Sequence, residues 1–273
     1  MRFGLDIAQQ RMPFAEVIDR TRFAEDLGFD GMWGFDHFQP MYGDGPGECF
    51  EGMTTLAALA TATSRIRLGL MVTGITYRPI PLLATQAITI DHASNGRLEL
   101  ALGAAWFEAE HDALGFDFPP TGARVDLVED ALVILNRVFR EDDVTYEGKR
   151  ASVRHATINP KPVQSPSIPI WMGAFGKQRM MPLVAKYADA WHAQGDLAFM
   201  VKRSELLDRL CEEAGRPPSA VLRATSLSLE DPLDDVRRSI DAWRDAGFGY
   251  LYCGWPSGGR PVIEAFADAV LRG

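Results

Sequence analysis

The sequence has few cysteines, no long apolar run and no excess of positive charge. Its three cysteines, Cys49, Cys211 and Cys253, lie far apart and form no C-x-x-C pair, which argues against a disulfide framework and a cysteine-ligated zinc site. No apolar stretch approaches the roughly 20 residues of a membrane span, and the first residues lack the pattern of a signal peptide. We therefore expect a cytoplasmic protein with reduced thiols.

The charge balance is acidic. With 37 acidic and 28 basic residues, the chain has a formal net charge of -9, whereas nonspecific binding to nucleic acid requires a basic face. We expect neither a nucleic-acid nor a membrane partner, so any bound anion must be held by a local group of donors. The hydrophobic fraction of 47% and the charged fraction of 24% are those of an ordinary globular protein.

Apolar segments of strand length alternate with segments of helical periodicity. The predicted strands cover residues 3–8, 31–35, 67–72, 98–103, 168–173, 190–193, 222–228 and 249–253, and the predicted helices cover residues 14–27, 53–62, 81–94, 107–114, 124–140, 179–187, 197–213, a segment after 232, and 261–271. Eight strand–helix units indicate an α/β fold of the (β/α)8 TIM-barrel type. The first turn lacks the glycine fingerprint expected of an open dinucleotide-binding sheet.

The predicted barrel forms a single domain over residues 1–273. Barrels of this type typically contain about 250 residues. The proline-rich stretch 142–169 is predicted to be a short insertion before the fifth strand rather than a separate domain.

Polar side chains follow several predicted strands, at the end where such a barrel carries its active site. Asp36 and His37 come directly after the second strand. A histidine titrates near neutrality and can exchange a proton with a bound ring or substrate, although an Asp-His pair after a strand is more often part of a local turn. His111 and His192 also fall near strand ends, so a metal site is considered, but the sequence has no H-x-H or H-E-x-x-H pair.

The turn after the fifth strand, residues 173–179, is predicted to bind an anion. Its glycines allow close approach of a phosphate, the next helix directs its amides toward the turn, and Lys177 and Arg179 add positive charge. It is not a Walker loop, because Trp171 replaces the first glycine and Gln178 follows the lysine. The alternative interpretation is a glycine-rich turn with solvated basic residues.

Other residues beyond the strand ends are less specific. Trp106 and Trp255 are placed to line the barrel mouth and to contact a planar ring. Among Glu108 and Glu110 we expect one solvated carboxylate, as for most glutamates.

Several segments taken together resemble a known family. They are residues 24–30, 35–38, 62–69, 72–74, 96–98, 105–111, 119–124, 160–164, 169–173 and 187–191. In this order they resemble the bacterial luciferase-like monooxygenase superfamily, and most closely its branch of oxidoreductases that depend on the deazaflavin coenzyme F420.

The resemblance implies a homodimeric TIM barrel that binds coenzyme F420, or alternatively FMN, in the barrel mouth. Asp36 and His37 would be the catalytic residues facing the ring, and Val72-Thr73 would form a strand-end bulge, often with a cis peptide. The implied cofactor-binding residues are Asp36, Val72, Thr73, Gly74, Ala105, Trp106, Gly173, Ala174, Phe175, Gly176, Lys177, Gln178 and Arg179. The aromatic residue that some sugar-phosphate-oxidising relatives carry after their Asp-His pair is not evident here, where Met41 lies nearby.

The leading hypothesis is hydride transfer between F420 and a small organic substrate, with His37 shuttling a proton and Asp36 orienting it. The second is an FMN-dependent monooxygenase on the same scaffold. A third, from another class, is a metal-dependent barrel hydrolase or isomerase using His37, His111 and His192, and a fourth is a cofactor-binding protein with little catalysis of its own. Under the leading hypothesis no metal is expected.

Overall fold

Eight parallel strands close into a barrel in the computed structural model, which describes residues 1–272. The strands are β1 (Arg2–Asp6), β2 (Gly31–Gly34), β3 (Arg67–Leu70), β5 (Leu98–Gly103), β8 (Ile170–Gly173), β9 (Ala190–His192), β10 (Leu222–Leu227) and β11 (Tyr250–Cys253). Each pairs in parallel with the next, and β11 pairs with β1 to close the ring. The predicted TIM-type barrel is confirmed.

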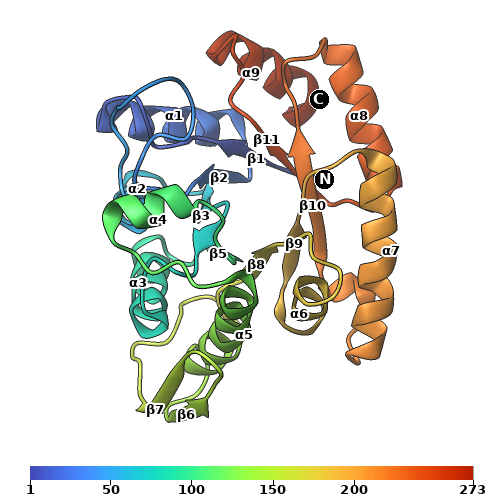
Figure 1. Ribbon diagram of the computed structural model, residues 1–273. Coiled ribbons are helices and arrows are strands. Elements are labelled where there is room, and N and C mark those ends of the chain that lie inside the picture. The colour runs from blue at the N-terminus through green and yellow to red at the C-terminus, as the bar shows by residue number, and fades with distance from the viewer. Residues whose placement is uncertain (273) are drawn as a thin grey trace.

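Helices surround the strands (Figure 1). They are α1 (Phe14–Leu27), α2 (Gly52–Ala62), α3 (Ile80–Ala93), α4 (Glu108–Leu114), α5 (Thr121–Val138), α6 (Met180–Tyr187), α7 (Leu197–Glu213), α8 (Leu233–Asp245) and α9 (Arg260–Phe266), with a 3-10 turn at Pro218–Ala220 and a π-helical turn at Ala267–Leu271. The bounds predicted for α1 and α7 are correct, whereas the last predicted helix changes to π geometry after Phe266. No helix within residues 1–272 is long and apolar enough to cross a membrane.

The predicted insertion before the fifth strand is a hairpin. Its strands β6 (Val144–Glu147) and β7 (Ser152–Ala156) pair antiparallel and extend away from the barrel below α5 (Figure 1). The carboxylate of Asp130, on α5, accepts hydrogen bonds from the backbone N–H groups of Arg150 and Ala151, at 2.6 and 2.9 Å. The hairpin is therefore fixed to the neighbouring helix.

The third strand is interrupted where the sequence predicted a continuous strand. The ladder of β3 ends at Leu70, the Met71–Val72 peptide is cis, and the chain resumes as β4 (Thr73–Gly74) against β5. This confirms the bulge that the family resemblance implied. A Cβ built at Gly103 or Gly173 would lie 2.4 or 2.9 Å from a methyl group of Val72, so glycine at both positions makes room for the displaced Val72 side chain.

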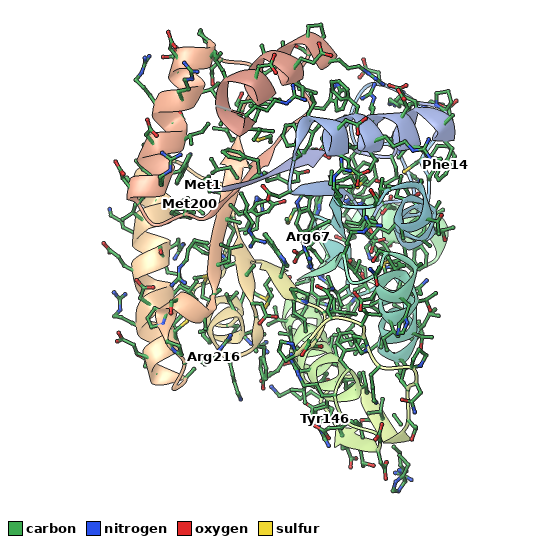
Figure 2. All side chains as sticks on the ribbon, turned by 180° about the vertical axis from the view of Figure 1, so that it is seen from behind. Met1, Phe14, Arg67, Tyr146, Met200 and Arg216 are labelled. Carbon is green, nitrogen blue, oxygen red and sulfur yellow. The ribbon has the colours of Figure 1, made fainter. Side chains whose placement is uncertain are left out.

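Large aromatic side chains fill the amino-terminal half of the barrel. Trp33 packs against Trp171 with ring centroids 4.9 Å apart, and its indole N–H donates a hydrogen bond of 2.7 Å to the Tyr250 hydroxyl. Glu99 accepts from the Trp171 indole and pairs with Arg67, which lies near the centre of the view in Figure 2. This packed layer closes one end of the barrel, so a ligand cavity can open only at the other end.

Candidate active site

A cavity of about 830 Å³ lies at the carboxyl ends of the strands, within the size range of small-molecule sites. The predicted site residues that line it are Asp36, His37, Val72, Gly74, Ala105, Trp106, Gly173, Ala174 and Phe175. The predicted residues that do not line it are Thr73, which is buried behind the wall, and Gly176, Lys177, Gln178 and Arg179, which are exposed. The strand ends therefore bring most, but not all, of the predicted residues together.

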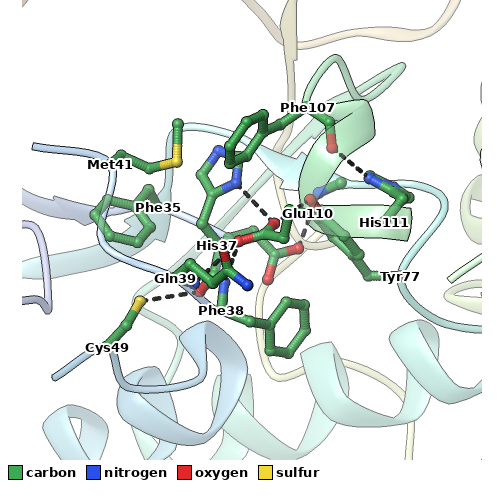
Figure 3. Close-up of polar contacts among 12 residues, drawn as sticks. Phe35, His37, Phe38, Gln39, Met41, Cys49, Tyr77, Phe107, Glu110 and His111 are labelled. Carbon is green, nitrogen blue, oxygen red and sulfur yellow. Dashed lines mark hydrogen bonds and ion pairs between the residues drawn. The ribbon is translucent and has the colours of Figure 1, made fainter. Parts of the chain in front are cut away.

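His37 is held by a glutamate from another strand-end loop. Its Nδ1 lies 3.0 Å from Oε2 of Glu110, which is fully buried in the first turn of α4 (Figure 3). The same oxygen accepts a 2.5 Å hydrogen bond from the Tyr77 hydroxyl, and Oε1 accepts from the backbone N–H groups of Phe38 and Gln39 at 2.8 and 3.0 Å. Glu110 thus fixes both the imidazole and the backbone that carries it.

These hydrogen bonds decide the charge of Glu110. Burial raises the pKa of this carboxyl, but the hydrogen bonds from Tyr77, Phe38 and His37 lower it by more, so its pKa lies below the usual value. An ionised carboxylate only accepts hydrogen bonds, so Nδ1 of His37 must carry the proton that it shares with Glu110. In the neutral ring, Nε2 is then left with its lone pair, available to a ligand in the cavity.

Asp36 does not orient His37, contrary to the prediction from sequence. Its two oxygens accept hydrogen bonds of 2.6 and 2.8 Å from the guanidinium of Arg78, and one of them also accepts from the N–H of Gly74 at 2.8 Å. Glu51 forms a second ion pair with Arg78, at 2.9 Å. Asp36 therefore fixes the start of β4 and the cavity wall.

Arg179 points away from the predicted phosphate turn. Its guanidinium bonds to Asp126 on α5 at 2.6 Å and to the carbonyl of Gly122 at 3.0 Å. The prediction that Arg179 adds charge to a phosphate site is wrong, because this arginine is neutralised by its neighbour. Gly173, Ala174 and Phe175 remain as the part of the turn that faces the cavity.

Aromatic and polar side chains complete the mouth. The Trp106 side chain is 67% exposed, stacks on Phe107 and lies with its ring centroid 5.7 Å from that of His37. Trp255, predicted at the mouth, instead packs against Phe23 and is not among the residues lining the cavity.

The opposite wall is polar, and the sequence pointed to only one of its residues, His192, as a metal ligand in the third hypothesis. Asp6, His192, Ser226 and Tyr252 line it at the ends of β1, β9, β10 and β11. Burial lowers the pKa of His192 to about 4, so this imidazole is neutral near pH 7, and its Nε2 lies 3.3 Å from the Ser226 hydroxyl. Burial raises the pKa of Asp6 to about 6 despite hydrogen bonds from Tyr252 and the backbone of Ala8.

A model of the luciferase-like monooxygenase family matches residues 1–249. The chain belongs to the luciferase-like monooxygenase family. Among curated proteins it is similar to an F420-dependent glucose-6-phosphate dehydrogenase of Microbacterium testaceum, with 33% identity over 178 residues, 64% of this chain and 52% of the relative. An enzyme of the same name from Intrasporangium calvum is 32% identical over 191 residues, 69% of this chain and 55% of the relative. The chain thus matches about half the length of these relatives.

A solved structure confirms the luciferase-like fold. It is described as an F420-dependent secondary alcohol dehydrogenase in complex with an F420-acetone adduct, and it superimposes with a TM-score of 0.88 over 99% of this chain and 98% of that chain. Since the two sequences are only 17% identical, this likeness concerns the fold of this family member and not its substrate.

The histidines of this luciferase-like protein do not form a metal-ligand cluster within residues 1–272. His111 Nε2 bonds to the Thr76 hydroxyl at 2.6 Å. Its Nδ1 donates to the carbonyl of Phe107 at 2.7 Å (Figure 3). Within residues 1–272 no group of three or more His, Cys, Asp or Glu side chains is arranged to hold a metal ion. The third hypothesis, a metal-dependent hydrolase or isomerase, therefore has no ligand set to support it.

Proposed function

We propose that this protein is a coenzyme F420-dependent oxidoreductase that transfers a hydride between the deazaflavin and an uncharged alcohol or carbonyl compound. The observation that carries the proposal is the His37–Glu110 pair in the cavity wall. The pair supplies an imidazole that can exchange a proton with a ligand in the cavity. The relatives of this chain include enzymes named for their dependence on F420.

The cavity fits a planar ring. One wall is formed by the displaced Val72, and next to it Gly74, Gly103 and Gly173 present backbone without a side chain. A Cβ at Gly254, on another edge of the cavity, would meet no atom within 4 Å, so the mouth is open there. Val72, Gly74 and Gly173 would hold the ring, and residues 173–175 would border its phosphate.

The residues then act as follows. When bound, F420 supplies two-electron hydride chemistry and stays inert to oxygen. Nε2 of His37 accepts the proton of a substrate hydroxyl in oxidation and donates it to a carbonyl oxygen in the reverse direction. Glu110 keeps the proton on Nδ1 and stabilises the imidazolium that forms. Trp106 limits the access of water to the His37 side of the cavity.

The charges of the cavity favour an uncharged substrate. None of the residues that line the cavity is a lysine or arginine. A sugar phosphate, which the relatives' name suggests, would place a dianion near the carboxyl of Asp6, and the lining has no lysine or arginine to pair with it. Burying unpaired charge is costly. An alcohol or ketone instead finds the donors and acceptors of His37, His192 and Ser226.

The proposal is tested first by cofactor titration. Purified protein is titrated with F420 and, separately, with FMN, and is then assayed for F420 reduction against a panel of short-chain alcohols, aldehydes, ketones and glucose 6-phosphate. We expect binding of F420 and turnover of an uncharged alcohol or carbonyl. Tight binding of FMN without binding of F420 would instead support the monooxygenase alternative.

His37→Ala is the companion variant. We expect its turnover to fall by about 10²–10⁴-fold while its affinity for F420 changes little, because the residues proposed to hold the ring lie in the Val72 wall. Equal turnover of the variant and the wild type would show that His37 does not exchange the substrate proton.

We also propose a cytoplasmic homodimer, as the family resemblance implies. Light scattering after gel filtration measures the mass in solution, and a monomer across the accessible concentration range would reject the dimer. Fractionation of the native cells tests the compartment.

A further inference from the structure

A second, basic hollow lies beside the active-site cavity. It has a volume of about 220 Å³ and is lined by Lys177, Phe199, Lys202, Arg203, Leu206 and Arg209. Five of these six residues come from α7, where the positions 199, 202, 203, 206 and 209 share one helix face. We call this hollow the basic groove.

The four cations of the basic groove have no acidic partner. Nearby arginines are paired, Arg179 with Asp126 and Arg223 with Asp208, whereas none of the groove's lysines or arginines forms an ion pair within residues 1–272. The Nε of Arg203 is buried without any hydrogen-bond partner, and its guanidinium lies 4.8 Å from the centre of the Phe199 ring.

A protein with a net charge of -9 has many carboxylates with which to neutralise such a cluster. The groove cations are nevertheless left without one, which indicates a site for an external polyanion.

The basic groove and the active-site cavity share a thin wall. Phe175 lines the cavity, and Lys177, two residues later in the same turn, lines the groove. On the other side, Gly195 lines the cavity, and a Cβ placed there would lie 2.6 Å from the Phe199 ring, so that ring packs directly on Gly195. A ligand whose phosphate sits at the turn after β8 therefore has the basic groove beside it where its chain leaves the cavity.

We propose that the basic groove binds the polyanionic tail of the cofactor. Beyond its phosphate, F420 carries a lactyl group followed by glutamates, so the end that leaves the cavity bears several carboxylates. This inference rests on the proposed function, since it assigns the groove to the same ligand. It also accounts for the distribution of charge, with an uncharged substrate inside the cavity and the carboxylates of the cofactor tail outside it.

The test compares two forms of one cofactor by fluorescence titration. F420 with its glutamate tail and F420 from which the glutamates have been removed are titrated into the wild type and into Lys202→Gln/Arg209→Gln. A matched control, Arg154→Gln/Lys186→Gln, removes two exposed cations that do not line the groove. The wild type should bind the tailed form roughly 3- to 30-fold more tightly, as expected for two exposed charge pairs, and less so at high salt.

The preference for the tail should shrink in Lys202→Gln/Arg209→Gln, which leaves only Lys177 and Arg203 in the groove, and should persist in full in the control. Equal affinity of the wild type for both forms, or an unchanged preference in the groove variant, would overturn this inference and leave the proposed function standing. Binding of free oligoglutamate without a preference for tailed cofactor would also overturn it, because the polyanion would then be a separate ligand. Failure to bind either form would reject the proposed function and this assignment together.

Discussion

Substitution of Glu110 by glutamine separates orientation of His37 from binding of the cofactor. The carboxylate accepts from His37 and Tyr77 through Oε2 and from the N–H groups of Phe38 and Gln39 through Oε1. A glutamine retains Oε1 for the two backbone groups but places an NH₂ donor where Oε2 was. Nδ1 of His37 must then accept rather than donate, which puts the proton of the neutral ring on Nε2.

With its proton on Nε2, the imidazole cannot accept a proton from an alcohol. General acid–base catalysis contributes about 10²–10⁴-fold, so kcat for alcohol oxidation by Glu110→Gln should fall by that factor, equivalent to about 3–5 kcal/mol of barrier. The dissociation constant for F420 should remain within about threefold, because the groups assigned to hold the ring are untouched. Loss of deazaflavin absorbance measures turnover, and fluorescence titration measures binding.

Glu108→Gln is the matched control, since Glu108 lies on the same helix and is exposed. It should behave as the wild type does. The reasoning would be refuted if Glu110→Gln turned over at the wild-type rate with an unchanged pH profile, because the carboxylate would then not set the tautomer of His37.

Three further predictions concern stability. Asp36→Asn removes one of the two carboxylates that pair with the buried Arg78 and should lower the free energy of unfolding by about 1–3 kcal/mol. A loss below about 1 kcal/mol in urea titration would contradict the ion-pair geometry. Gly103→Ala forces a Cβ against the side chain of Val72 and should cost about 1–3 kcal/mol, whereas Gly176→Ala, with no atom nearer than 3.6 Å, should change stability little. Burial lowers the pKa of His192 from 6.5 to about 4, so the unfolded chain binds a proton that the folded chain does not, and stability falls as the pH drops from 6.5 to 4. His192→Gln should remove up to about 3 kcal/mol of that loss, and identical pH dependence of wild type and variant would refute it.

The fold could be predicted from the sequence because its strands and helices bury regular apolar faces. The interruption of the third strand was visible only through the family resemblance, since Leu70, Met71 and Val72 are all apolar and read as one strand. The change to π geometry after Phe266 was not visible either, because residues 267–271 contain neither glycine nor proline to mark it.

The candidate site was predicted only in part, because its key contact joins residues distant in sequence. His37 could be chosen from its place after β2, but its partner Glu110 lies 73 positions away. Nothing in the local sequence distinguishes the buried Glu110 from the exposed Glu108. Asp36 was chosen because it is adjacent to His37, yet consecutive side chains leaving a strand tend to point to opposite sides, and Asp36 turns to Arg78 instead.

The charges around the barrel mouth match two separate requirements of the proposed ligands: proton transfer inside the cavity and binding of an anionic tail outside it. Glu110 is fully buried, where the low local dielectric strengthens its effect on His37. A lysine or arginine beside Nε2 of His37 would oppose that effect, because a nearby positive charge disfavours the imidazolium. The lining of the cavity contains no lysine or arginine, while four cations gather in the basic groove outside the thin wall at Gly195. The cations that would bind the cofactor tail thus lie where solvent screens their charge from the proton transfer at His37. A cation introduced on the polar wall, as in Ser226→Lys, should accordingly favour anionic substrates and reduce turnover of uncharged ones.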